Sequence, residues 1–353
     1  MKFKYLNGVI CFCLTLASSV LSAQAQDTHR TEGHGLASFS QSHKLEGSGL
    51  ASFSQSHKED TRSLSHYILG VYCEGLGDLE GAVGEYQKAL ETNPQSSLLH
   101  LNLASVFIQK NNPAQATEEL KQSIKLAPEA VQPHALLALV YAAQDKADLA
   151  TGEYILALEN ATKAEPENID IYKGLGVIYL QQNKLKQAEG IFKLILNLAP
   201  ADPQAHFYLG NIYYNLEDYP SVEEELKSAI KLKPDYHEAL NFLGYFYLEQ
   251  DKNIDQAGLM IKQALVFEPE NGAYLDSLGW FYYKKGKFKE ALSHLERAAS
   301  FLSDPVIYEH LGDVFLKLGN LESAKLNWEK SLKLDSRSDK VKAKLLKVTN
   351  HGK

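Results

Sequence analysis

One short motif returns eight times along residues 63–338, and it sets the fold class of the chain. A leucine is followed by glycine or alanine, and in seven of the eight copies an aromatic residue stands three positions later. The small residues are spaced 34, 34, 38, 34, 34, 35 and 33 positions apart. Such a period indicates a supersecondary unit that cannot bury its own apolar face and must stack on its neighbours. The eight pairs are Leu69-Gly70, Leu103-Ala104, Leu137-Ala138, Leu175-Gly176, Leu209-Gly210, Leu243-Gly244, Leu278-Gly279 and Leu311-Gly312.

Each copy is predicted to form two amphipathic helices joined by a turn. Apolar residues recur at helical spacing, and an alanine or valine follows the small residue by twelve or thirteen positions. The small residue of the first helix is expected to face that alanine, so that the two backbones approach closely. Most copies end at a proline, such as Pro128 or Pro200, which stops the second helix.

This unit resembles the tetratricopeptide repeat (TPR) family in its period, its Leu-Gly/Ala-x-x-Tyr core, its downstream alanine and its closing proline. Residues 241–245 and 271–280 also resemble exported bacterial TPR proteins. The resemblance implies an all-α TPR solenoid, a right-handed superhelix of about eight helix-turn-helix repeats. The predicted repeats are 63–96, 97–130, 131–168, 169–202, 203–236, 237–271, 272–304 and 305–338.

Departures from the period predict local structure. Repeat three has 38 residues, so its second helix is expected to lengthen by about one turn, over 149–164, and to protrude at one rim. Repeat six has one extra residue near 252–255, which is expected in the turn. Repeat one has Cys73 in place of the aromatic residue and four glycines between 75 and 84, which predicts the least stable end. A stripe of Val341, Leu345 and Val348 predicts a capping helix with a basic tail over 339–353.

The N-terminus is predicted to be a signal peptide over residues 1–25. Two lysines precede an apolar run from Val9 to Val20, and an Ala-x-Ala site ends at Ala25. Cleavage before Gln26 would change the net charge from −8 to −10. The run is shorter than the roughly 20 residues that span a bilayer, so no integral membrane span is expected in the mature chain. An uncleaved anchor is the alternative.

Residues 26–62 are predicted to be a low-complexity, disordered leader. They contain a tandem duplication, EGHGLASFSQSHK at 32–44 and EGSGLASFSQSHK at 46–58. Each copy has too few apolar groups to offset the entropy of ordering. Two alternatives remain for this leader: a histidine-based metal tract, or a docking motif built on the two Leu-Ala-Ser-Phe units.

No catalytic, cofactor or metal motif stands out in the sequence. The glycines from 75 to 81 do not have the spacing of a dinucleotide loop, and no P-loop or His-Glu-x-x-His pattern occurs. Asp276, Ser277 and His294 could be imagined as a triad, but ordinary helix positions explain them. We therefore expect no enzyme activity, no cofactor and no small-molecule substrate. The net negative charge also argues against nucleic acid as a partner.

The family resemblance places one stripe of each first helix on the concave side of the superhelix. In repeats five to seven this stripe combines aromatic rings, which supply contact area, with amides that can pair with a peptide backbone. Packing between adjacent repeats is the alternative explanation for these rings. Because Val177 follows Lys173 in the stripe, recognition of a C-terminal two-carboxylate motif is not expected. The predicted partner-binding groove consists of Lys173, Phe207, Asn211, Tyr214, Asn241, Tyr245, Leu248, Asp276, Trp280 and Tyr283.

These features predict a protein–protein interaction scaffold that holds a peptide or helix of a partner in the concave groove. The expected location is the periplasm or outer cell envelope of a Gram-negative bacterium, or outside the cell if the source is not bacterial. One alternative is a structural spacer that joins an assembly through its rims or ends. Another is a holdase-like chaperone for exported clients.

Overall fold

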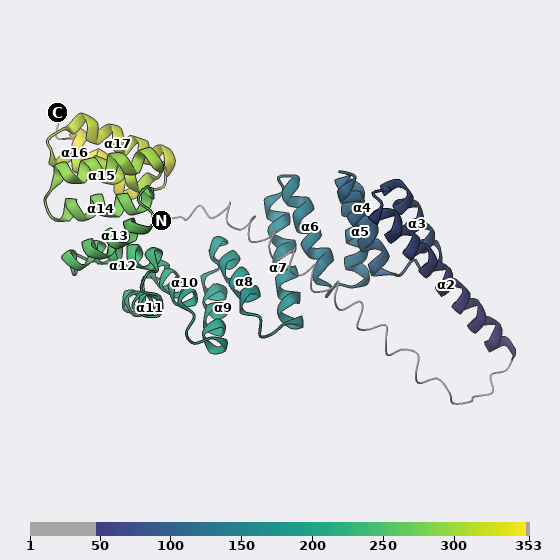
Figure 1. The fold of residues 1–353 in the computed structure, drawn as a ribbon. Helices are drawn as coiled ribbons and strands as arrows, with labels where there is room; N and C mark the ends of the chain where they lie inside the picture. Colours follow the sequence, from purple (N-terminus) through teal and green to yellow (C-terminus); the bar gives the residue numbers. More distant parts are fainter. Residues whose placement is uncertain (1–46, 351–353) are drawn as a thin grey trace. The chain divides into compact units, whose positions relative to one another are not determined.

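The computed structural model describes residues 47–350, and every regular element within that range is an α-helix. The signal peptide with its cleavage site at Ala25 and Gln26, the first copy of the duplication, and the last three residues lie outside the described residues. The chain divides within α8 into two compact blocks, an N-terminal block ending at Ile178 and a C-terminal block beginning at Tyr179. Figure 1 shows the helices of each block standing side by side in chain order. The predicted all-α TPR solenoid is confirmed.

Of the seventeen helices in the described part of the chain, fourteen have one of two lengths. Seven first helices have 13 residues each and seven second helices have 14. The first helices are α4 (Ser97–Gln109), α6 (Val131–Ala143), α8 (Ile169–Gln181), α10 (Pro203–Asn215), α12 (His237–Glu249), α14 (Gly272–Lys284) and α16 (Pro305–Lys317). The second helices of that length are α3 (Leu79–Thr92), α5 (Pro113–Leu126), α9 (Leu185–Leu198), α11 (Tyr219–Leu232), α13 (Ile254–Phe267), α15 (Phe288–Phe301) and α17 (Leu321–Leu334).

Three helices depart from these lengths. The second helix of repeat three, α7 (Ala147–Ala164), has 18 residues, which confirms the predicted lengthening. The final helix α18 (Asp339–Asn350) packs on α17, and its Val341 is fully buried against Ala324 and Trp328. The first helix α2 (Gly47–Gly75) has 29 residues and is the purple helix at one end of Figure 1. It begins inside the predicted leader 26–62, so for residues 47–62 the structure differs from the expected disorder.

Short polar residues and prolines explain where the helices begin. Asp202 Oδ1 accepts a hydrogen bond from the backbone N–H of Ala205 at 2.8 Å, and Asn320 Oδ1 accepts one from Ser323 at 3.0 Å. Such caps satisfy donors that a helix N-terminus leaves without a partner. Pro203 and Pro305 occupy the first turn, where a missing N–H is harmless.

Each turn inside a repeat contains one residue with left-handed backbone geometry. Repeat six has a second such residue, Asn253, in a turn of four residues between α12 and α13. The extra residue of repeat six therefore lies in the turn, as predicted. The left-handed residue at the equivalent position of the eight turns is, in chain order, Gly77, Asn111, Asp145, Asn183, Glu217, Asp251, Gly286 and Gly319.

The small residue of each first helix permits close contact with the second helix. A Cβ at Gly279 would lie 2.6 Å from Cγ of Leu295 and 3.2 Å from the carbonyl oxygen of Ala291. The expected alanine is therefore one neighbour, and the large residue one turn later is the other. Gly244 repeats this arrangement against Ile261 and the carbonyl of Ala257.

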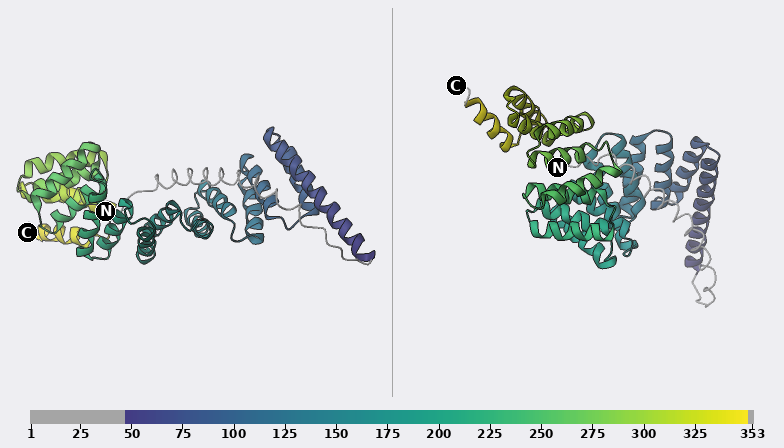
Figure 2. Two further views of the ribbon diagram at one scale, coloured as in Figure 1. Left: turned by 60° about the horizontal axis from the view of Figure 1, so that its bottom comes forward. Right: turned by 60° about the vertical axis from the view of Figure 1, so that its left-hand side comes forward.

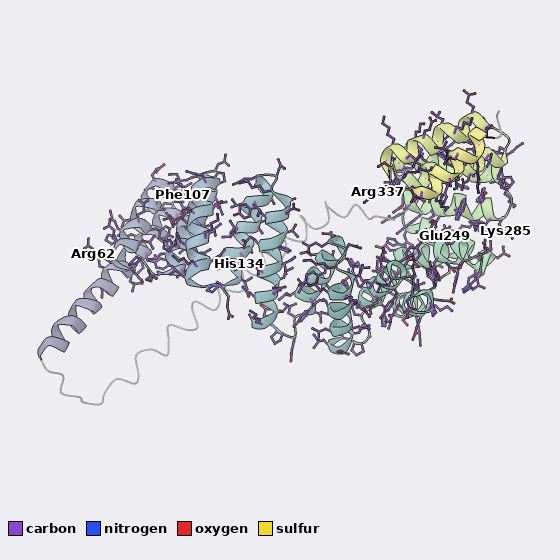
Figure 3. The ribbon with its side chains drawn as sticks, turned by 180° about the vertical axis from the view of Figure 1, so that it is seen from behind. Arg62, Phe107, His134, Glu249, Lys285 and Arg337 are labelled. Atoms are coloured by element: carbon purple, nitrogen blue, oxygen red, sulfur yellow. The ribbon has the colours of Figure 1, made fainter. Side chains whose placement is uncertain are left out.

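A histidine and a glutamate join the two helices of four repeats. The histidine Nδ1 lies 2.6–2.7 Å from a glutamate oxygen nineteen residues later. Nε2 of His134, which is labelled in Figure 3, also lies 3.1 Å from the carbonyl oxygen of Pro128, which closes the preceding repeat. In repeat four Tyr172 donates to the equivalent Pro166 carbonyl. The four pairs are His66–Glu85, His100–Glu119, His134–Glu153 and His206–Glu225.

Candidate functional site

The predicted groove residues of the C-terminal block lie on first helices that touch one another. Helix α12 packs on α14, and α14 packs on α16, whereas α13 and α15 each pack on the first helices before and after them. Figure 2 shows this block from two further directions. We call the surface formed by the predicted stripe on α10, α12, α14 and α16 the first-helix face.

Half of the predicted groove residues are buried, and the other half are partly buried. Phe207 packs edge-on against Phe242 of the next first helix, with ring centroids 6.2 Å apart. Tyr214 contacts Phe242 and Phe246 in the same way. The buried five are Phe207, Asn241, Leu248, Asp276 and Trp280. In this structure these five side chains are covered mainly by neighbouring residues of the same chain.

The partly buried five are the residues that a partner could reach. They are Lys173, Asn211, Tyr214, Tyr245 and Tyr283. Lys173 belongs to α8 in the N-terminal block, and the other four belong to the C-terminal block.

An aromatic stack occupies the middle of the first-helix face. Trp280 lies between two rings, Tyr283 at 4.4 Å and His310 at 4.0 Å, with interplanar angles of 7° and 11°. Its indole N–H donates to Oε1 of Glu249, which is labelled in Figure 3, at 2.8 Å. The buried indole thus has its polar atom satisfied, and the stack ties α12, α14 and α16 together.

A buried ion pair lies beside this stack. His310 Nδ1 donates to Asp276 Oδ1 at 2.8 Å, and both side chains are only 3% exposed. Burial alone would lower the pKa of His310, but the carboxylates of Asp276, Glu309 and Glu249 raise that pKa above its ordinary value. The pair therefore favours the charged imidazolium, because the uncharged ring would leave Asp276 buried without a counter-ion.

Two lysines of α18 reach the acids of α16. Lys344 Nζ donates to Glu309 Oε1 and to Asp313 Oδ2, each at 2.6 Å, and Lys340 Nζ lies 3.0 Å from the same Glu309 oxygen. Burial would raise the pKa of Glu309, but Lys344 and Lys340 hold it below its ordinary value. The other Asp313 oxygen accepts from the indole N–H of Trp328 at 3.1 Å.

Four members of this site were not predicted from the sequence: Glu249, His310, Lys340 and Lys344. The sequence does contain a signal that could have identified them. Their contacts join residues about one repeat apart, such as 276 with 310 or 309 with 344. Complementary charges separated by one period are neighbours when successive first helices pack together. The lysines of α18 follow the same rule, since α18 takes the place of a ninth first helix.

Catalytic and metal arrangements find no support in the described residues. Asp276 pairs with His310, Ser277 Oγ donates to the carbonyl of Ala273, and His294 stacks on Tyr282, so the imagined triad is not assembled. Among the side chains that the structure describes, those of residues 61–348, no three His, Cys, Asp or Glu are grouped so as to hold a metal ion. None of the helices described there is long and apolar enough to cross a membrane.

Comparison with solved structures supports the fold. A tetratricopeptide repeat protein from Parabacteroides merdae superposes with a TM-score of 0.54 at 19% identity, over 72% of this chain and 99% of that one. The Cut9–Hcn1 hetero-tetramer of the APC/C gives 0.51 at 14% identity, over 83% and 78%. The human IFIT1 dimer with m7Gppp-AAAA gives 0.51 at 19% identity, over 73% and 65%. At these identities the likeness concerns the fold alone.

Comparison at the sequence level supports the family. A TPR repeat-containing protein of Pseudomonas aeruginosa is 28% identical over 96 residues, which are 27% of this chain and 16% of that protein. This chain therefore matches only a small part of that relative. The tetratricopeptide repeat family matches residues 75–140, 141–208, 272–301 and 306–338. The chain belongs to the tetratricopeptide repeat family.

Proposed function

We propose that this protein is a non-catalytic interaction scaffold that holds a peptide or helix of a partner protein on the first-helix face of its C-terminal block. The observation that carries the proposal is a set of three partly buried tyrosines, Tyr214, Tyr245 and Tyr283, whose rings pack on buried rings of the same block. Rings held rigidly by a packed layer lose little entropy when a partner covers them. Asn211, about one turn before Tyr214 on α10, accepts at its Oδ1 from Asn215 Nδ2, and its N–H groups can donate to a peptide backbone.

We propose that the partner is a protein and that binding takes place in the cell envelope or outside the cell. The signal-peptide pattern of residues 1–25 supports export, and the net charge of −10 after cleavage makes a polyanionic nucleic acid an unfavourable ligand. Intact mass of the exported protein tests the first part: a chain beginning at Gln26 supports it, and retention of residues 1–25 contradicts it.

A photo-crosslinking amino acid at Tyr283 tests the groove directly in living cells. The expected result is one dominant adduct with a defined protein. The matched control places the same crosslinker at Lys289, an exposed position on the second helix α15, where that adduct should be absent. Equal capture at both positions, or none at Tyr283, would contradict groove binding. Many weak adducts would instead indicate a holdase.

A second candidate function is supported by the N-terminal end. Leu69 is 47% exposed, whereas the leucine at the same position of every later repeat is 1–6% exposed. Tyr72 is 63% exposed beside it. The stacking surface that every other first helix uses is therefore open on α2. A spacer joined through this end would form concentration-dependent oligomers, and Leu69→Glu combined with Tyr72→Glu would abolish them in light scattering.

A further inference from the structure

Acidic side chains gather on the first-helix face of repeats six to eight. Their oxygens take hydrogen bonds from cations and N–H groups of the same chain: Trp280 and His310 on one side, Lys340 and Lys344 on the other. We call Glu249, Asp276, Glu309 and Asp313 the acid row. Glu309 and Asp313 thus hold two ammonium groups at 2.6–3.0 Å, whereas Glu249 and Asp276 accept from Trp280 and His310 of the aromatic stack.

Helix α18 is held there by few apolar contacts. Val341 is its one fully buried side chain within the described residues, and Leu345 and Val348 are only partly buried. Leu346 is 62% exposed. Helices inside the array bury three or more residues each, as α16 and α17 do on either side of this contact. Besides these apolar contacts, α18 is attached through the ionic contacts of Lys340 and Lys344 with Glu309 and Asp313.

A buried polar atom without a hydrogen-bond partner in the described part of the chain, Oδ1 of Asn241, lies in the same stripe of the first-helix face. Asn241 is 3% exposed, and its Oδ1 accepts no hydrogen bond from any described residue. It holds, in repeat six, the stripe position that Asp276 and Glu309 hold in repeats seven and eight. A buried amide oxygen without a donor is unfavourable. A ligand that brings an N–H donor to this position would relieve it, as the lysines relieve Glu309.

Resting on the proposed function above, we propose that the acid row is a binding site for a lysine-bearing amphipathic helix of a partner protein, and that α18 is the intramolecular occupant which such a helix displaces. Charge complementarity defines the partner: ammonium groups four residues apart, as in Lys340 and Lys344, flanked by apolar residues at helical spacing. The site takes a helix and not a bare cation, because the apolar surface around Trp328 and Ala324 is part of it.

The test uses the full chain and a fluorescein-labelled peptide of residues 338–350 as the probe, followed by fluorescence anisotropy. Wild-type protein should bind the probe weakly, because α18 already occupies the acid row. Lys340→Gln combined with Lys344→Gln weakens this internal competitor and should raise affinity for the probe at least five-fold. Adding Glu309→Gln and Asp313→Asn to that protein should lower affinity at least ten-fold.

Two controls separate the site from general electrostatics. Glu322→Gln combined with Glu329→Gln removes the same charge from exposed positions on α17 and should leave probe affinity within two-fold of its parent. A probe in which glutamine replaces the residues equivalent to 340 and 344 should not bind. Unchanged affinity in the lysine variant, or equal loss with the α17 control, would overturn the proposal.

Hydrogen exchange gives a measurement that needs no variant. Excess probe added to wild-type protein should accelerate amide exchange in α18 while α15 stays protected. If α18 exchanges at the same rate with and without the probe, displacement does not occur. The basic-helix proposal can fail while the proposed function stands: a partner that crosslinks at Tyr283 but is not displaced by the probe supports the scaffold and refutes the basic-helix partner. Absence of any adduct at Tyr283 would instead contradict the proposed function.

Discussion

At the scale of single residues, the Asp276–His310 pair makes stability depend on pH. The folded-state pKa of His310 lies above its ordinary value. The contribution of the protonated ring to the free energy of unfolding is therefore complete below about pH 6.5, and it is lost as the pH rises through the folded-state pKa. The free energy of unfolding should therefore fall with pH above 6.5, at a slope approaching about 1.4 kcal/mol per pH unit for one proton. The charged groups that face the ring are Asp276, Glu309 and Glu249.

Urea unfolding at a series of pH values checks this prediction. Asp276→Asn combined with His310→Gln removes both charges, so neither is left buried without a partner. The double variant should show a flatter slope than wild type between pH 6.5 and 9. Parallel curves would mean that His310 does not hold its proton in the folded state.

The close approach at Gly279 predicts a second effect at residue scale. An alanine there gains up to about 1 kcal/mol of helix propensity, but its Cβ would meet the Leu295 side chain at 2.6 Å. Overpacking of this kind typically costs about 1–3 kcal/mol, so Gly279→Ala should destabilise. The control is Gly190→Ala on α9, where no atom lies within 4 Å of the new Cβ and stabilisation is expected. Thermal unfolding of the two variants should therefore shift in opposite directions.

At the scale of elements, α18 packs on α17, the position predicted for a capping helix. Its stripe covers α17 through Val341, whose truncation to alanine should lower the free energy of unfolding by about 1–3 kcal/mol. Leu346→Ala on the exposed side of the same helix should change it by less than about 0.5 kcal/mol. Denaturant titration distinguishes the two variants. Similar losses would indicate that α18 contributes only its helix propensity.

At the scale of the whole molecule, stability is expected to be uneven along the array. Among the described residues, repeat one packs on repeat two alone, and Leu69 and Tyr72 are exposed. At three of its glycines, Gly75, Gly77 and Gly84, an added Cβ would meet no atom within 4 Å, so these positions are not tightly packed. Since a repeat array is stabilised by nearest-neighbour contacts, amides of α3 should exchange with solvent before those of α12 and α14. Slower exchange in α3 would contradict this gradient.

The period alone determined which segments are helical and nearly where they end. The Leu-Gly/Ala pairs and the capping residues make their contacts within one repeat. The helix pair of each repeat, the longer α7 and the extra turn residue of repeat six were therefore predictable. The leader was less predictable, because the composition that suggested disorder for 47–62 does not prevent α2 from beginning at Gly47. The stripe on the first helices could also be read, since it follows from helical spacing.

Only the tertiary structure decided which members of that stripe are buried. Phe207 and Trp280 are covered because neighbouring first helices pack together. The distance between neighbouring first helices depends on how each repeat is rotated against the next. The pairing of Asp276 with His310, and of Lys344 with Glu309, depends on the same rotation. A sequence period specifies contacts within a repeat, whereas the angle between repeats arises from the summed packing of many side chains. The one-repeat spacing of these charges is present in the sequence, but which acid pairs with which cation was decided by the tertiary structure.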